Sequence, residues 1–316
     1  KKYTKTSETL GFRGFFVYSC YTRDFTGFPP TLNSIEEEQK MRILLLGVAT
    51  LCLAIPAMAF DFGRLMITGD SLTEGTGLAP YAFRERLHHN LAAGGHSFTN
   101  VGPLGGGDFP GTSGGTNRHA GFGGWSIRDL VQGRPAQPQA GNLGQWMVDY
   151  NPNTVVFMAG VNDIWDTLFN TANWGPTLQA NIQNILPARY ESVMQTIYNA
   201  NPNARVFMVA PPKLLPNGTD YRLPYSQALR DIAQATATQW AGQGKDVHFV
   251  DLWTPISSVP WVHFGPDNVH WNEAGAELAG DTIYAQMNAV PEPMTMTVLA
   301  LAGGWLVRRR AAKRTP

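Results

Sequence analysis

An alternation of short apolar segments with longer amphipathic segments, between about residues 65 and 287, most constrains the fold. The clearest apolar segment, residues 154–159, reads TVVFMA and carries no charge. Such a run is typical of a strand in the middle of a parallel sheet that helices cover on both faces. Because strands that alternate with helices are joined by right-handed crossovers, the sequence predicts a three-layer α/β/α sandwich.

The expected elements follow this alternation along the chain. We expect strands at residues 65–68, 97–101, 154–159, 205–210 and 247–252, and helices at 81–91, 127–132, 143–150, 178–198, 226–240 and 273–287. The glycine-rich segment 102–124 is too long for a simple connection. We therefore expect it to be a functional or mobile loop.

Composition and charge exclude several classes of protein. The chain has 316 residues, 43% of them hydrophobic, and a formal net charge of +0, which suits one large or two small domains and argues against nucleic acid as a partner. Its two cysteines, Cys20 and Cys52, precede the predicted domain, so we expect neither a thiol nucleophile nor a zinc–thiolate site there. The histidines other than His270 lack ligand spacing with nearby acids, and we expect neither a metal nor a cofactor.

A serine turn follows the first predicted strand. The apolar residues 65–67 lead into Gly69, Asp70, Ser71 and Leu72. A buried strand followed by a turn and a helix is how α/β proteins present a nucleophile, and glycine lets the backbone bend sharply there. The alternative is a strand-ending turn in which Ser71 only caps a helix.

Three later segments favour a nucleophilic serine over a serine that only caps a helix. They are GFGGW at 121–125, GVND at 160–163 and DNVH at 267–270. Together with GDSL at 69–72, they resemble, in order, the four blocks of the GDSL or SGNH hydrolase superfamily, over about residues 64–290. The resemblance implies a flavodoxin-like, five-stranded parallel sheet with the strand order 2-1-3-4-5. It also implies a serine-dependent hydrolase.

Ser71, Asp267 and His270 are the candidate catalytic residues. His270 would be the base, since an imidazole titrates near neutral pH. Asp267 lies three residues earlier, from where its carboxylate can reach the ring nitrogen that faces away from the serine and fix the tautomer. The alternative is that Asp267 caps the helix that begins near Trp271.

The resemblance also implies an oxyanion hole. Its donors would be the backbone N–H groups of Ser71 and Gly124 and the side-chain amide of Asn162. Gly124 is preferred because it precedes a tryptophan, as in a Gly-Trp variant of the family, although Gly121 and Gly123 compete with it. Asn162 could instead be only a turn residue.

Tryptophans near the blocks suggest a surface for sugars. Trp125, Trp165, Trp261 and Trp271 lie close in sequence to the four blocks, and aromatic faces suit stacking on sugar rings. We assign Trp125 to substrate binding, although most tryptophans belong to a protein's core.

The blocks most resemble those of secreted carbohydrate esterases of the acetyl xylan esterase type. The expected function is removal of O-acetyl groups from carbohydrates, because a small acyl group needs no long apolar groove and the sequence shows no amphipathic lid. A lipolytic esterase or lysophospholipase is the alternative among enzymes. A non-catalytic surface protein associated with exopolysaccharide is the alternative outside them.

The N-terminal segments suggest export. Residues 1–40 show no period, and we expect a leader or an upstream extension, with a small ordered element as the alternative. Residues 41–59 resemble a signal peptide, with one arginine, an apolar run and the small-residue site Ala57-Met58-Ala59 for signal peptidase. The expected hydrolase domain is 60–290.

The C-terminal segment 291–316 joins Pro-Glu-Pro, a short apolar run and three arginines. It resembles the PEP-CTERM sorting signal of Gram-negative bacteria, which implies transient anchoring in the inner membrane and removal by a protease of the exosortase type. The basic cluster would stay on the cytoplasmic side. The alternative is a C-terminal helix that packs on the domain.

Overall fold

The computed structural model describes residues 59–75, 78–165, 176–214, 222–259 and 261–290. The predictions for the leader at 1–40, for the signal peptide up to residue 58 and for the sorting tail at 291–316 lie outside these residues. Among the helices of the described ranges, none has the length and apolar character needed to cross a membrane.

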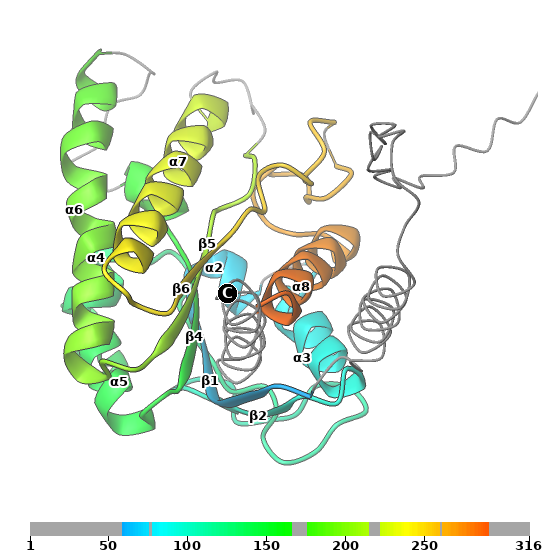
Figure 1. Ribbon diagram of the computed structural model, residues 1–316. Coiled ribbons are helices and arrows are strands. Elements are labelled where there is room, and N and C mark those ends of the chain that lie inside the picture. Colours follow the sequence, from blue (N-terminus) through cyan, green and yellow to red (C-terminus); the bar gives the residue numbers. More distant parts are fainter. Residues whose placement is uncertain (1–58, 76–77, 166–175, 215–221, 260, 291–316) are drawn as a thin grey trace, which may run out of the picture. The chain divides into compact units, whose positions relative to one another are not determined.

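A parallel sheet forms the middle layer (Figure 1). Its strands are β1 (Asp61–Gly69), β2 (Ser97–Val101), β3 (Ala120–Gly121), β4 (Thr154–Met158), β5 (Arg205–Val209) and β6 (Val247–Val250). The long strands lie in the order β2-β1-β4-β5-β6, which is the predicted order 2-1-3-4-5 once the short β3 is set aside. The predicted fold class is therefore confirmed.

The short strand β3 was not predicted. It pairs in parallel with the end of β1, with Thr68 opposite Ala120 and Gly69 opposite Gly121. The glycine-rich segment 102–124 is thus not wholly irregular. This pairing holds the second sequence block beside the serine turn.

Helices cover both faces of the sheet. They are α2 (Ser71–Glu74), α3 (Arg84–Ala93), α4 (Ile127–Gln132), α5 (Leu143–Tyr150), α6 (Pro176–Ala200), α7 (Arg222–Gly242) and α8 (Glu273–Asn288), with 3-10 turns η1 (Pro138–Ala140) and η2 (Val161–Trp165). Figure 1 shows α4 to α7 on one side of the sheet and α3 and α8 on the other.

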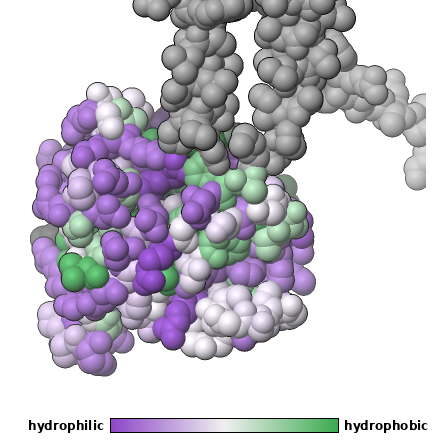
Figure 2. Space-filling model, turned by 60° about the horizontal axis from the view of Figure 1, so that its bottom comes forward, coloured by the Kyte–Doolittle hydropathy of each residue, from purple (hydrophilic) through white to green (hydrophobic). Residues whose placement is uncertain are grey.

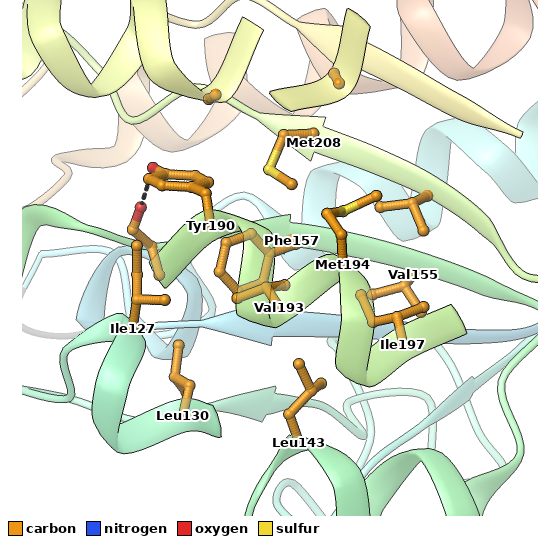
Figure 3. Close-up of a cluster of buried hydrophobic side chains, with 14 of the residues drawn as sticks. Ile127, Leu130, Leu143, Val155, Phe157, Tyr190, Val193, Met194, Ile197 and Met208 are labelled. Carbon is orange, nitrogen blue, oxygen red and sulfur yellow. Dashed lines mark hydrogen bonds between the residues drawn. The ribbon is translucent and has the colours of Figure 1, made fainter. Parts of the chain in front are cut away.

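The two cores follow from the alternation of side chains along the strands. On β4, Val155 and Phe157 belong to the core under α4 to α7, whereas Val156 belongs to the core under α3 and α8. Figure 3 shows the first core, where Phe157 lies among side chains of α6 such as Val193 and Met194. An unbroken apolar strand is therefore required, since both faces are buried.

Several element boundaries differ from the prediction for local reasons. Helix α3 begins at Arg84 rather than at residue 81, because Ala82 has a φ of +47°, which a right-handed helix does not allow. Strand β6 ends at Val250, since the carboxylate of Asp251 accepts the backbone N–H groups of Trp253 and Thr254 and so starts a turn.

Candidate active site

Ser71 occupies the first position of α2, directly after β1. The Asp70 side chain caps this helix by accepting the Leu72 N–H at 3.0 Å. Gly69 packs so closely on the end of β4 that a Cβ there would lie 1.9 Å from the Met158 carbonyl oxygen. The sharp turn therefore needs glycine, and it leaves Ser71 at the carboxyl end of the sheet with 8% of its surface exposed.

The structure brings Ser71, His270 and Asp267 together. Ser71 Oγ lies 2.9 Å from His270 Nε2, and His270 Nδ1 lies 2.6 Å from Asp267 Oδ2. The loop that carries His270 is tied to the serine helix, because the buried Trp271 Nε1–H donates to the Leu72 carbonyl at 3.0 Å. Contacts between residues 199 positions apart thus build one chain of hydroxyl, imidazole and carboxylate.

The surroundings of Asp267 favour its role as a partner of histidine. Its Oδ1 accepts the N–H groups of Val269 and His270, both at 3.0 Å. Burial raises the pKa of Asp267, but these bonds and the His270 ring outweigh burial, and the pKa is lowered. Asp267 does not cap α8, because Asn272 holds that position and accepts the Gly275 N–H.

The second and third blocks lie beside the serine. A Cβ on Gly123 would lie 3.9 Å from Ser71 Cβ, and Asn162 Nδ2 donates to the Trp125 carbonyl at 3.2 Å. Gly121 is excluded as an oxyanion donor, since its N–H already donates to His119 Nδ1 at 3.0 Å.

The N–H groups of Ser71, Gly123 and Gly124 have no protein acceptor in the part of the chain that the structure describes, as an oxyanion hole requires, so Gly123 still competes with Gly124. The side chain of Asn162 is bonded to the second sequence block, so Asn162 is more than an isolated turn residue. The role of all three donors stays a prediction.

The chain matches a known family over most of this domain. The sequence profile described as "GDSL-like Lipase/Acylhydrolase family" matches residues 67–278, which include all four blocks and more than half of the chain. The chain belongs to the GDSL-like lipase/acylhydrolase family. It is thus an ester hydrolase of this family, and the match contains the serine, the histidine and the acid that the fold brings together.

Solved structures share the fold of this GDSL hydrolase. A family 3 carbohydrate esterase of Clostridium thermocellum has a TM-score of 0.53 and 22% identity, and covers 72% of this chain and 95% of its own. An acetyl esterase mutant with an acetate ion, and a family 3 carbohydrate esterase of Talaromyces cellulolyticus, each have a TM-score of 0.52 and 21% identity over 71% of this chain and 95% of theirs. At this identity the likeness shows the fold alone. No curated protein matches the sequence.

The structure corrects the assignment of Trp125 to substrate binding. Only 1% of Trp125 is exposed, and its ring stacks on Phe122 with a centroid distance of 4.4 Å and packs near Trp146. Its Nε1–H donates to Gln137 at 2.8 Å. A sugar cannot stack on a ring that the core covers, so in this GDSL hydrolase Trp125 contributes packing and the carbonyl that positions Asn162.

Two buried acids lie behind the serine turn. Asp163 pairs with Arg189 at 2.6 Å and accepts the Ile127 N–H at 2.9 Å. Asp70 is fully buried, and this burial raises its pKa to about 7. Backbone hydrogen bonds such as that from Leu72 lower the pKa, whereas the nearby charge of Asp163 raises it further. The carboxyl group beside the candidate nucleophile therefore titrates near neutral pH.

Sequence reasoning missed Arg84. The residue is 1% exposed, and its guanidinium donates to the carbonyls of Thr73 and Glu74, each at 2.7 Å, and to the Asn117 side chain. Carbonyls at the end of a helix lack partners within it, so Arg84 closes the serine helix and joins it to the glycine-rich segment. Burial lowers the pKa of Arg84 to about 10. An arginine within a predicted helix carries no pattern that would have revealed this.

The described residues contain no group of three His, Cys, Asp or Glu side chains arranged to hold a metal ion.

Proposed function

We propose that the protein is a secreted serine esterase that removes O-acetyl groups from carbohydrates. The observation that carries the proposal is the alignment of three side chains, with Ser71 Oγ 2.9 Å from His270 Nε2 and His270 Nδ1 2.6 Å from Asp267. A hydroxyl in this arrangement is activated by an adjacent base that a third group orients.

The reaction proceeds in two halves. Ser71 Oγ attacks the acetyl carbonyl while His270 Nε2 takes its proton, and Asp267 stabilises the imidazolium. The N–H groups of Ser71 and Gly124 and the amide of Asn162 hold the oxyanion. His270 then gives the proton to the departing sugar oxygen, which leaves acetyl-Ser71. Water, deprotonated by His270, attacks this ester, and acetate leaves as the proton returns to Ser71.

The substrate class has two supports. A small acyl group needs no long apolar groove, and the sequence shows no amphipathic lid. Two of the structures with a similar fold are called carbohydrate esterases, and a third is called an acetyl esterase and was crystallised with an acetate ion. These names motivate the choice of substrate, while the geometry motivates the mechanism.

Kinetics with the full chain and a Ser71→Ala variant test the mechanism. We expect 4-nitrophenyl acetate hydrolysis to fall at least a thousandfold in the variant, because the nucleophile is lost. Unchanged hydrolysis would refute the mechanism. A mass spectrum that shows acetyl-Ser71 after rapid mixing and acid quench would support the covalent intermediate.

Substrate panels test the ester class. We expect acetate release from acetylated xylan or acetylated bacterial exopolysaccharide, and an optimum at C2–C4 among 4-nitrophenyl esters. An optimum at C8 or longer would favour a lipolytic esterase. Absence of any turnover would favour a non-catalytic surface protein.

Export is part of the same proposal. The apolar run before Ala59 and the tail at 291–316 would direct the protein to the inner membrane and then to the cell surface, after cleavage by signal peptidase and by an exosortase-type protease. N-terminal sequencing of the mature protein should begin at Phe60. A mature N-terminus upstream of residue 41 would contradict the signal peptide.

A further inference from the structure

Several exposed large apolar side chains lie on segments that carry or contact the triad residues. Figure 2 shows one face of the domain, on which hydrophilic residues cover one part and a smaller apolar area lies beside them. The described residues with exposed large apolar side chains are Leu78, Val148, Leu223, Val259, Trp261 and Val262. All except Val148 lie on segments that border the triad in sequence or by contact.

Trp261 is the largest of them and 67% exposed. Its backbone has a φ of +62°, a conformation that bulky residues rarely adopt, and such outliers persist only where surrounding contacts hold them. Here the Asn272 amide donates to the carbonyls of Trp261, Val262 and Phe264, at 2.9, 3.2 and 3.2 Å. The indole is therefore presented to solvent by a fixed backbone.

The same contacts join Trp261 to the base. Phe264 pairs with Trp271 in an antiparallel bridge, and the Gly265 N–H donates to the His270 carbonyl at 2.8 Å. Asn272 lies two residues after His270, which is ~7 Å along an extended chain. The Trp261 carbonyl is thus tied to a residue two positions from the base, on the turn that leads into the Phe264–Trp271 bridge.

Two other exposed apolar residues, Leu78 and Leu223, lie on segments that contact the loop of residues 265–270. Leu78 Cδ1 lies 3.6 Å from where a Cβ of Gly265 would be. Leu223 follows Arg222, whose Nη1–H donates to the Asp267 carbonyl at 2.8 Å. The side chains of Leu78, Leu223 and Trp261 protrude from three separate segments. Separate apolar side chains of this kind suit the flat face of a sugar ring, whereas an extended acyl chain needs a continuous concave groove.

We propose that Trp261 is the platform on which the sugar ring next to the acetylated sugar stacks. This proposal rests on the carbohydrate esterase function proposed above and assigns to Trp261 the role that the buried Trp125 cannot fill. The indole face provides affinity and orientation for an oligosaccharide, while a small ester such as 4-nitrophenyl acetate reacts without touching it.

The test compares Trp261→Ala, Trp261→Tyr and Val148→Ala in the full chain. Both Trp261 variants keep a Cβ, so neither gains the freedom of glycine at φ +62°, and Val148, 71% exposed on α5, is the matched apolar control away from the triad. We expect kcat/KM for an acetylated xylo-oligosaccharide to fall about tenfold in Trp261→Ala, mostly through KM. It should stay within about threefold in Trp261→Tyr, which keeps an aromatic face, and unchanged in Val148→Ala.

Hydrolysis of 4-nitrophenyl acetate separates stacking from a structural role. We expect it to be unchanged in all three variants. An equal loss on both substrates in Trp261→Ala, or no loss on the oligosaccharide, would overturn the proposal. A loss confined to C8 esters would also overturn it and identify an acyl chain as the occupant.

Binding distinguishes failure of this proposal from failure of the proposed function. Calorimetry with an unacetylated xylo-oligosaccharide and the Ser71→Ala chain should give a Kd that rises at least about fivefold on adding Trp261→Ala. Turnover of acetylated glycans with no dependence on Trp261 refutes the stacking platform alone. Hydrolysis of 4-nitrophenyl acetate with neither binding nor deacetylation of any glycan refutes both.

Discussion

Asn162 donates its side-chain amide to the backbone carbonyl of Trp125, at 3.2 Å. This bond joins the segment after β4 to the segment after β3, so two oxyanion candidates, Gly124 and Asn162, are held in one unit beside Ser71. One amide hydrogen of Asn162 is used for positioning, and we propose that the other donates to the developing negative charge.

Replacement of Asn162 by alanine tests this arrangement. We expect kcat for 4-nitrophenyl acetate to fall about 10²- to 10³-fold, because one oxyanion donor is lost, with little change in KM. The melting temperature should change little, since Asn162 is only half-buried and its side chain makes one hydrogen bond to the described residues. A kcat within a few fold of the wild type would remove Asn162 from the oxyanion hole.

The variant Trp125→Phe tests whether the Trp125 ring belongs to the core or binds the substrate. The change removes the hydrogen bond to Gln137 and part of a buried ring, so we expect the free energy of unfolding to fall by about 1–3 kcal/mol. The KM for an acetylated oligosaccharide should not change, because the ring has no exposed face. A large rise of KM with unchanged stability would instead restore Trp125 as a substrate residue.

Asp70→Asn tests the buried acid beside the serine. Because burial raises the pKa of Asp70 to about 7, the folded chain holds a proton that the unfolded chain has lost between pH 4 and 7. The free energy of unfolding of the wild type should therefore decrease as pH rises through this window, by up to about 4 kcal/mol from this group. Asparagine caps a helix equally well and does not titrate.

Urea unfolding at pH 4, 5.5 and 7 measures the difference between the two proteins. The comparison is needed because burial lowers the pKa of His119 to about 3, which makes stability rise with pH between 3 and 6.5 and opposes the Asp70 slope. Relative to the wild type, Asp70→Asn should gain stability as pH rises. Parallel pH profiles would show that Asp70 is ionised in the folded chain at all these pH values.

Arg84→Met tests the residue that closes the serine helix. Loss of the guanidinium leaves the buried carbonyls of Thr73 and Glu74 without a partner, so we expect stability to fall by about 2–4 kcal/mol. The kcat should also fall, because the helix that carries Ser71 loses its anchor. Arg84→Lys should recover part of both. Differential scanning calorimetry would measure the stability, and kinetics at a temperature where all variants are folded would measure kcat. An unchanged kcat in Arg84→Met would show that the bonds of Arg84 to the serine helix are purely structural.

The layers could be predicted from the sequence because they depend on local patterns, whereas the strand order came only from the resemblance to the GDSL or SGNH family. A fully apolar strand such as β4 requires cover on both faces, and the spacing of Asp267 and His270 already places a carboxylate within reach of the ring. The rest depends on contacts that no local pattern contains. The pairing of β3 with β1, the burial of Trp125 by Trp146 and the bonds from Arg84 to Asn117 all join residues that are distant in sequence.

The exposure of a tryptophan side chain could not be predicted from its position in the sequence. Trp125 and Trp261 are both close to a sequence block, yet one is 1% and the other 67% exposed. The first follows β3, which pairs with β1, whereas the second lies on a loop held from one side by Asn272.

The central claim is that His270 activates Ser71, and labelling with a fluorophosphonate probe tests it most directly. Peptide mapping of the labelled full chain should find one adduct, on Ser71, and the rate of labelling should fall at least about a hundredfold in His270→Gln, which lacks the base. Failure of the folded chain to form this adduct, or a rate that does not depend on His270, would contradict the account.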